Sequence, residues 1–112
     1  MSQAQMPYHK LIGYQLALEL VRLVARVPIR DARLREQARK SAASAALNTA
    51  EGAARQSRAD KSRVYGIALA EACEAVAAVE IAEALGACSP ADVEEVLKLG
   101  VSVKNVLSRL VR

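Results

Sequence analysis

Apolar residues recur at three- and four-residue steps along four stretches of this 112-residue chain, and short breaks that contain Pro or Gly separate the stretches. Such spacing places the apolar side chains on one face of an α-helix. We therefore predict helices over about residues 11–27 and 32–55, from a start within 57–60 to residue 85, and from residue 90 onward. No stretch alternates apolar and polar residues as a half-buried strand does.

The breaks carry residues that are typical of helix ends. Asp31 and Ser89 are predicted caps, because their side-chain oxygens can accept a hydrogen bond from an unpaired amide of the first turn. Ser57 and Asp60 are alternative caps for the third helix, and Gly86 is a typical stop after it. Four helices with short connections predict an all-α fold, an antiparallel up-down-up-down four-helix bundle.

The whole chain, residues 1–112, is predicted to form one bundle domain, with residues 1–10 as a flexible lead-in. It has no Phe or Trp, and its apolar residues are mostly Ala, Val and Leu, so the helices must approach closely. The predicted inner stripe of the third helix is Val64, Ile67, Ala68, Ala72, Ala75, Val79, Ala82 and Leu85. That helix is apolar beyond this stripe, which predicts more than one packing partner. The predicted stripe of the fourth helix is Val93, Val96, Leu97, Gly100, Val103, Leu107 and Leu110.

A polar motif, NTAEGAARQSR, lies at the end of the second predicted helix. Asn48, Glu51 and Arg55 are neighbours on a helix surface, so we predict that Glu51 contacts both Arg55 and Asn48. Gly52 costs roughly 1 kcal/mol relative to Ala in a helix, which favours a close approach by another helix or another subunit. We expect a helix-contact site that Glu74 of the third helix joins, and a direct ligand or nucleic-acid site is the alternative.

The wider run QARKSAASAALNTAEGAARQS resembles the central signature of the four-helix-bundle family of the 23S ribosomal RNA intervening-sequence protein. The matching residues of this run are Gln37, Arg39, Lys40, Ser44, Asn48, Ala50, Glu51, Gly52 and Arg55. Further matches are Tyr8, Leu11, Tyr14, Ala17, Ile67, Ala68 and Glu74. The resemblance covers roughly residues 8–86, and the fourth helix is similar in type only. The chain departs from the family pattern at Ala45, Ala46, Ala70 and Glu71, where members usually have Ile-Pro and Gly-Ser.

This resemblance implies a homo-oligomeric protein without enzymatic activity. Members of the family look like small bundles that form cyclic homo-oligomers, and the resemblance implies a homopentamer here. Some members are encoded within insertions in ribosomal RNA genes. A related bundle resembles the accessory protein of diversity-generating retroelements, which binds nucleic acid and a reverse transcriptase. No enzymatic activity and no cofactor follow from the resemblance.

Clustered cations are the strongest functional signal of the sequence. Residues 1–63 hold 12 Lys/Arg and 5 Asp/Glu, whereas residues 64–112 hold 4 and 7. The candidate nucleic-acid-binding residues are Arg30, Arg33, Arg35, Arg39, Lys40, Arg55, Arg58, Lys61 and Arg63. The last four are expected to meet at one end of the hairpin of the second and third helices, and the first three near the other end. Clustered cations suffice to attract phosphates, and the lack of interleaved aromatic residues predicts weak sequence specificity. A solvated face, or pairing with acids such as Asp60, is the alternative.

The sequence contains few residues in the patterns that catalytic or metal-binding sites require. His9 is the only histidine and lies in the lead-in. The pairs Glu71/Glu74 and Glu80/Glu83 have the spacing of carboxylate-bridged di-iron bundles, but no helical His accompanies them. We therefore predict no catalytic residue, no metal site and no cofactor.

Two cysteines and the absence of targeting signals suggest a cellular compartment. The chain has no apolar run long enough to span a membrane and no pattern of a signal peptide. Cys73 and Cys88 are then expected to be free thiols of a cytoplasmic protein. Cys73, in an apolar helical run, is expected to behave as a small hydrophobe.

Together these observations predict a non-enzymatic bundle that assembles with copies of itself. RNA, DNA or a nucleoprotein is the favoured further partner, bound with low sequence specificity. A protein-interaction scaffold that binds no nucleic acid is the alternative, and a small-molecule or metal enzyme built on the bundle is a remote third.

Overall fold

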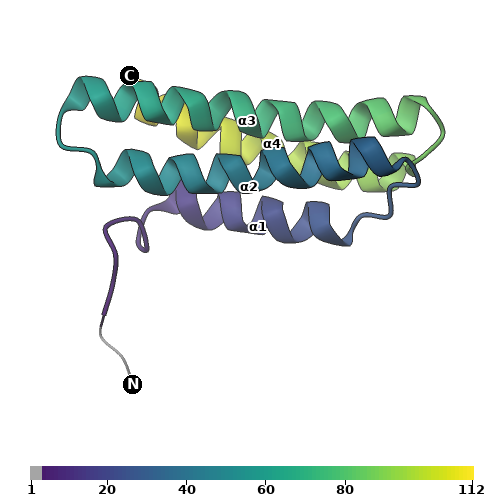
Figure 1. Ribbon diagram of the computed structural model, residues 1–112, viewed down its shortest axis with the longest axis horizontal. Coiled ribbons are helices and arrows are strands. Elements are labelled where there is room, and N and C mark those ends of the chain that lie inside the picture. The colour runs from purple at the N-terminus through teal and green to yellow at the C-terminus, as the bar shows by residue number, and fades with distance from the viewer. Residues whose placement is uncertain (1–3) are drawn as a thin grey trace.

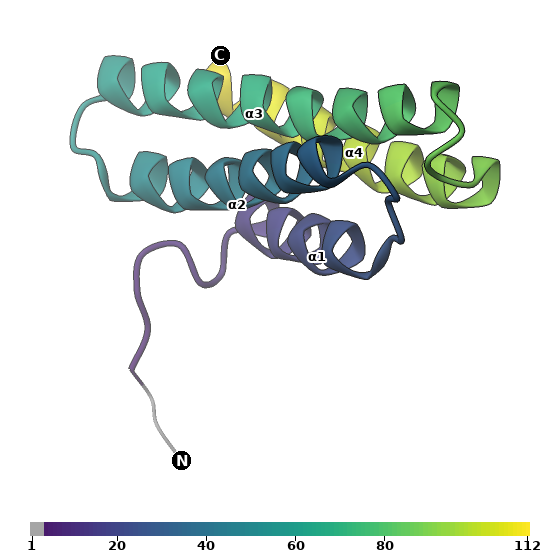
Figure 2. The same cartoon turned by 45° about the vertical axis from the view of Figure 1, so that its right-hand side comes forward.

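The computed structural model describes residues 4–112, and 80% of these residues are helical. Its helices are α1 (Ile12–Arg26), α2 (Ala32–Ala54), α3 (Arg58–Ala84) and α4 (Pro90–Val111). Successive helices run in opposite directions and lie side by side (Figures 1 and 2). The prediction of an all-α four-helix bundle is therefore confirmed, with helix bounds close to those expected from the sequence.

Contacts between helices follow an antiparallel register. Ser41 of α2 donates a hydrogen bond to Glu74 of α3, whereas Gly52, later in α2, lies against Tyr65, which is earlier in α3. Residue pairs contact each other between α1 and α2, α2 and α3, α3 and α4, and α4 and α1. Each helix therefore packs against two others, and the core lies between all four.

The predicted caps form at three helix starts. Asp31 accepts a hydrogen bond from the Leu34 amide at 2.9 Å, Ser57 accepts one from the Asp60 amide at 3.1 Å, and Ser89 caps α4 in the same way. Of the two alternatives for α3, the cap is therefore Ser57. These bonds satisfy amides that have no partner within the helix.

The connection after α3 requires a glycine. Gly86 has a φ of +74°, the left-handed conformation that glycine adopts without steric cost. The backbone amide and the guanidinium of Arg30 donate to the carbonyls of Ala87 and Gly86 at 2.8 and 2.5 Å. The α1–α2 and α3–α4 connections are therefore fastened to each other at one end of the bundle.

Small side chains fill the core, as the sequence predicts. Ala17, Ala42, Ala68 and Ala75 are completely or almost completely buried, and Leu20 is among the largest fully buried residues. Because most buried side chains are short, only a few larger residues, such as Leu20 and Leu107, are needed to fill the space between the helices.

The prediction that the inner stripes are buried is wrong for three residues. Ile67 and Leu85 of the third-helix stripe are 43% and 66% exposed, and Leu97 of the fourth is 42% exposed. In their place the core takes Tyr65 and Ala78 from α3. A helix in a four-helix bundle buries one face, so α3, which is apolar nearly all round, leaves large side chains uncovered.

The two cysteines lie in different environments. Cys73 is exposed on α3, so its predicted role as a small core hydrophobe is wrong. Cys88, in the α3–α4 connection, is buried and free. Burial raises the pKa of the Cys88 thiol, and the nearby Asp92 carboxylate adds to the effect.

Residues 1–3 of the predicted flexible lead-in lie outside the described residues. After them, the amide of Met6 donates to Nδ1 of His9, and the side chain of Gln15 donates to the His9 carbonyl at 3.0 Å. Tyr8 packs edge-on against Tyr14 of α1, with ring centroids 4.7 Å apart. Within residues 4–112, no helix is long and apolar enough to cross a membrane.

Candidate functional site

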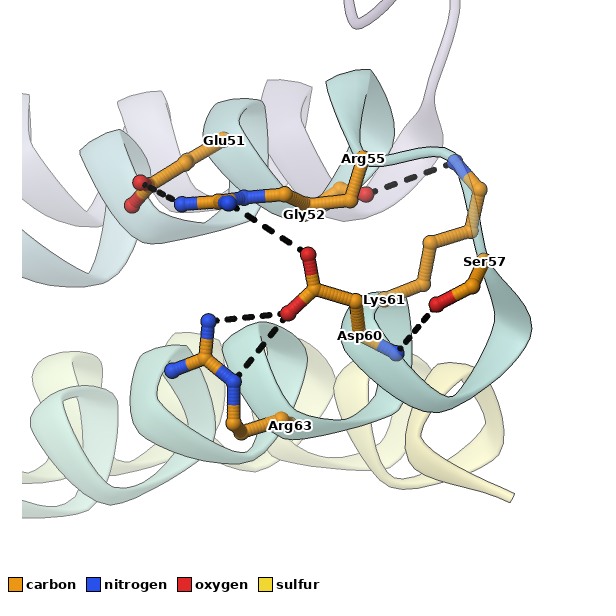
Figure 3. Close-up of polar contacts among 7 residues, drawn as sticks. All are labelled: Glu51, Gly52, Arg55, Ser57, Asp60, Lys61 and Arg63. Carbon is orange, nitrogen blue, oxygen red and sulfur yellow. Dashed lines mark hydrogen bonds and ion pairs between the residues drawn. The ribbon is translucent and has the colours of Figure 1, made fainter.

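The turn between α2 and α3 is held by a chain of charged side chains (Figure 3). Arg55 donates to Glu51 at 2.6 Å and to Asp60 at 3.3 Å. Arg63 donates to the other oxygen of Asp60 through two nitrogens, at 2.9 and 3.1 Å. Asp60 thus joins the last turn of α2 to the first turns of α3, and the predicted Glu51–Arg55 contact is present.

These contacts shift two ionisation equilibria. The pKa of Asp60 is below its ordinary value, chiefly because Arg63 donates hydrogen bonds to its carboxylate. The pKa of Arg55 is above its ordinary value, chiefly because Glu51 accepts its hydrogen bond. Both groups are solvated, so the network orients the turn more than it stabilises the fold.

Lys61 caps the end of α2 from the neighbouring helix. Its ammonium donates to the Ala53 carbonyl at 2.8 Å and lies 3.4 Å from the Gly52 carbonyl. Both carbonyls belong to the last turn of α2, where backbone carbonyls run out of amide partners. The Gly52 carbonyl also accepts from the Arg55 amide at 3.3 Å. A cation there also interacts favourably with the negative end of the helix dipole.

Gly52 of α2 lies directly against the Tyr65 ring of α3. A Cβ built at this position would lie 2.8 Å from two carbons of the Tyr65 ring. Gly52 itself is buried, and Tyr65 is 6% exposed. The close approach predicted from the sequence is therefore present, and the neighbour is a helix of the same chain.

Asn48 and Glu74, which were predicted to belong to the helix-contact site around Glu51, do not contact it. The Asn48 side chain donates to the carbonyl and hydroxyl of Ser44 at 2.9 and 3.1 Å, so the predicted Asn48–Glu51 contact is wrong. Glu74 accepts from Ser41 at 3.2 Å, farther along the α2–α3 hairpin, and is also not part of it. Asn48 turns back because a carbonyl one helical turn earlier is within reach of its amide.

The end of the bundle at the α2–α3 turn contains more cations than the four that the sequence predicts there. Arg58 donates to the carbonyl of Arg112, and Ser62 donates to the carbonyl of Val111. The last turn of α4, with exposed Arg109 and Arg112, therefore lies beside the first turn of α3, and Figure 1 shows the C-terminus toward this end. The alternation of helix directions is the signal that could have revealed this placement.

We call this group of six cations and two carboxylates the basic end of the bundle. Its cations are Arg55, Arg58, Lys61, Arg63, Arg109 and Arg112, and its carboxylates are Glu51 and Asp60. The predicted gathering of four cations at this end agrees with the structure. Arg55 and Arg63 are occupied by carboxylates, whereas Arg58, Arg109 and Arg112 have no described ion pair.

Some of the other candidate cations bond backbone carbonyls. Arg35 donates to the Ile29 carbonyl in the α1–α2 connection, and Arg39 donates to the Ala25 carbonyl in the last turn of α1. Arg33 and Lys40 are exposed, and within residues 4–112 no side-chain hydrogen bond or ion pair involves their charged groups. Arg30, Arg33 and Arg35 lie at the end of the bundle opposite the α2–α3 turn, as predicted, and Arg30 joins the two connections there.

No three His, Cys, Asp or Glu side chains of residues 4–112 lie close enough together to hold a metal ion. A groove of about 480 Å³ lies between α1 and α4. Its lining residues are Glu19, Arg22, Leu23, Arg26, Glu95, Lys98 and Leu99. It is open to solvent and of mixed charge.

The fold and this site define a small four-helix bundle whose central hairpin is clamped by charged residues and carries cations at one end. The chain belongs to the 23S rRNA-intervening sequence protein family, whose model matches residues 10–109. The match extends through α4, beyond the residues that carry the resemblance in the sequence. No curated protein sequence matches the chain significantly.

Proposed function

We propose that this chain is a non-enzymatic, cytoplasmic protein that self-associates and binds the phosphate backbone of RNA or DNA through its basic end. The observation that carries the proposal is the gathering of Arg58, Arg109 and Arg112 from two helices at one end of the bundle. Within residues 4–112 none of the three pairs with an Asp or Glu side chain, and Arg58 donates to the main-chain oxygen of Arg112. Phosphate attraction depends on such local density of positive charge and releases condensed counterions. The free thiols Cys73 and Cys88 agree with a reducing compartment.

Self-association strengthens this mechanism. Large apolar side chains, among them Leu47 and Ile81, are 70% and 51% exposed in the single chain. Exposed apolar patches of this kind are typical of protein interfaces. A cyclic assembly, a pentamer by family resemblance, repeats the basic end around an axis and increases the positive potential that a polyanion meets.

Fluorescence titration with labelled RNA and duplex DNA at several salt concentrations tests the proposal. The variant combines Arg58→Gln, Arg109→Gln and Arg112→Gln, which removes three cations from the basic end. We expect weaker binding to both nucleic acids, and a salt dependence shallower by about one unit of slope for each phosphate that the variant no longer neutralises.

The matched control combines Arg22→Gln, Arg26→Gln and Lys98→Gln in the α1–α4 groove, which lowers the net charge equally. It should weaken binding much less, because those cations lie outside the basic end. Equal effects of the two triple variants would contradict the assigned site. No binding by the parent chain at low salt would remove the nucleic-acid function and leave the protein-interaction scaffold.

A further inference from the structure

The outward side of α3 is a second helix-packing surface that the single chain leaves largely uncovered, and its Glu74 also accepts a hydrogen bond from Ser41 of α2. Ile67, Ala70, Glu74, Ala77, Ile81 and Ala84 follow one another at alternating steps of three and four residues, and we call them the α3 outer row. Ile67 and Ile81 are 43% and 51% exposed. Apolar residues at a mean spacing of 3.5 form the seam by which one helix packs along another.

A complementary row lies on α2. Lys40, Ala43, Leu47, Ala50 and Ala54 show the same alternating steps, and we call them the α2 outer row. Leu47 is 70% exposed and stands beside an apolar groove of about 280 Å³ that also includes Tyr14, Leu18 and Val21 of α1. Each row thus offers large aliphatic side chains among alanines, so knobs of one can enter the gaps of the other.

The two rows are separate surfaces. On the side of α2 that turns toward α3, Gln37 donates to Ser41, and Ser41 donates to Glu74. Gln37 and Ser41 belong to neither row, so polar side chains lie between the two rows, and a copy that docks on one row leaves the other open.

Charge decides which pairing of rows is favourable. A two-fold pairing of the α3 outer row with itself brings its central carboxylates, Glu74 and its copy, to the same place, and like charges at an interface are costly. The α2 outer row instead supplies Lys40, an exposed cation with no described ion pair. The opposite signs of Lys40 and Glu74 favour pairing of unlike rows.

From these observations we infer that the α3 outer row of one copy packs against the α2 outer row and adjoining α1 groove of the next, in a head-to-tail interface. This assignment rests on the self-association proposed above and specifies its surfaces. Head-to-tail contacts leave one free row at each end of a chain of copies, and a closed ring removes both.

Complementation between two variants tests the arrangement. Leu47→Glu disables the α2 outer row, and Ile81→Glu disables the α3 outer row. Both side chains are more than half exposed in the single chain, so folding should persist, as circular dichroism can verify. By light scattering, each variant alone should have the 12.0 kDa mass of one chain, and an equimolar mixture should form a two-chain complex and nothing larger.

The matched control is Ile12→Glu on α1, which is 56% exposed and belongs to neither row. It should keep the mass of the parent assembly. If only one of the two row variants dissociates the assembly, or if their mixture forms no complex, the head-to-tail assignment is wrong. A parent chain that is a single copy at millimolar concentration would instead refute self-association itself.

Discussion

Gly52 shows how one residue connects the sequence motif to the packing of the bundle. A glycine inside a helix is unfavourable by itself, yet this one faces the Tyr65 ring of α3 at a distance that excludes a methyl group. The position therefore requires the absence of a side chain, while its backbone remains helical.

Replacing Gly52 with Ala should lower the free energy of unfolding by about 1–2 kcal/mol, because overpacking against Tyr65 outweighs the gain in helix propensity. Urea denaturation at a fixed protein concentration measures the change. Gly66→Ala is the matched control, since its Cβ meets no atom within 4 Å, and it should raise stability by about 0.5–1 kcal/mol. Equal effects of the two substitutions would contradict the close-contact interpretation.

Asp60 makes the stability of the turn dependent on pH. Its pKa is lower in the folded chain, mainly because of Arg63, so its contacts stabilise the fold above the ordinary carboxyl pKa of about 3.9. This contribution disappears as the pH falls through the folded-state pKa. The stability difference between the parent and Asp60→Asn should be largest near neutral pH and should shrink below about pH 4. Denaturant unfolding at several pH values measures it, and a difference that is constant with pH would contradict this role.

At the level of helices, the junction of α2 and α3 depends on groups from both elements. Ser57 satisfies an amide at the start of α3, and Lys61 satisfies carbonyls at the end of α2. Helix ends otherwise leave backbone groups without a hydrogen-bond partner. At this short connection, Ser57 and Lys61 provide those partners.

Replacing Lys61 with Met removes the donor and the charge and keeps most of the aliphatic chain. We expect a loss of about 0.5–1 kcal/mol in the free energy of unfolding, because the end of α2 loses its cation. Chemical denaturation measures the change, with Lys98→Met as the control, since Lys98 is exposed and its ammonium has no described hydrogen bond. A comparable loss in the control would show that the effect is not specific to the helix end.

For the molecule as a whole, topology determines where charge collects. The basic residues of the α2–α3 turn are near in sequence, but Arg109 and Arg112 are about fifty residues away from Arg58. They meet because each helix reverses the direction of the one before it, which returns the end of α4 to the start of α3.

The helices, their caps and the contacts within one helix could be predicted from apolar periodicity and capping residues. Asp31 and Ser89 cap where expected, and the Glu51–Arg55 pair forms because both residues belong to one helix. Local interactions of this kind depend on spacing along the chain and hardly on the rest of the fold. Contacts that span two helices, such as Glu74 with Ser41, do not follow from spacing, because their register depends on how side chains interlock.

The sequence by itself determined four helices, their ends and their alternating order, since hydrogen bonding and apolar spacing act over a few residues. Only the tertiary structure decided which apolar face of α3 is buried, because nearly every side of that helix is apolar and the choice depends on Gly52, Tyr65 and the short side chains around them. The same choice left Ile67 and Ile81 uncovered, and it set Cys73 outside the core and Cys88 within it.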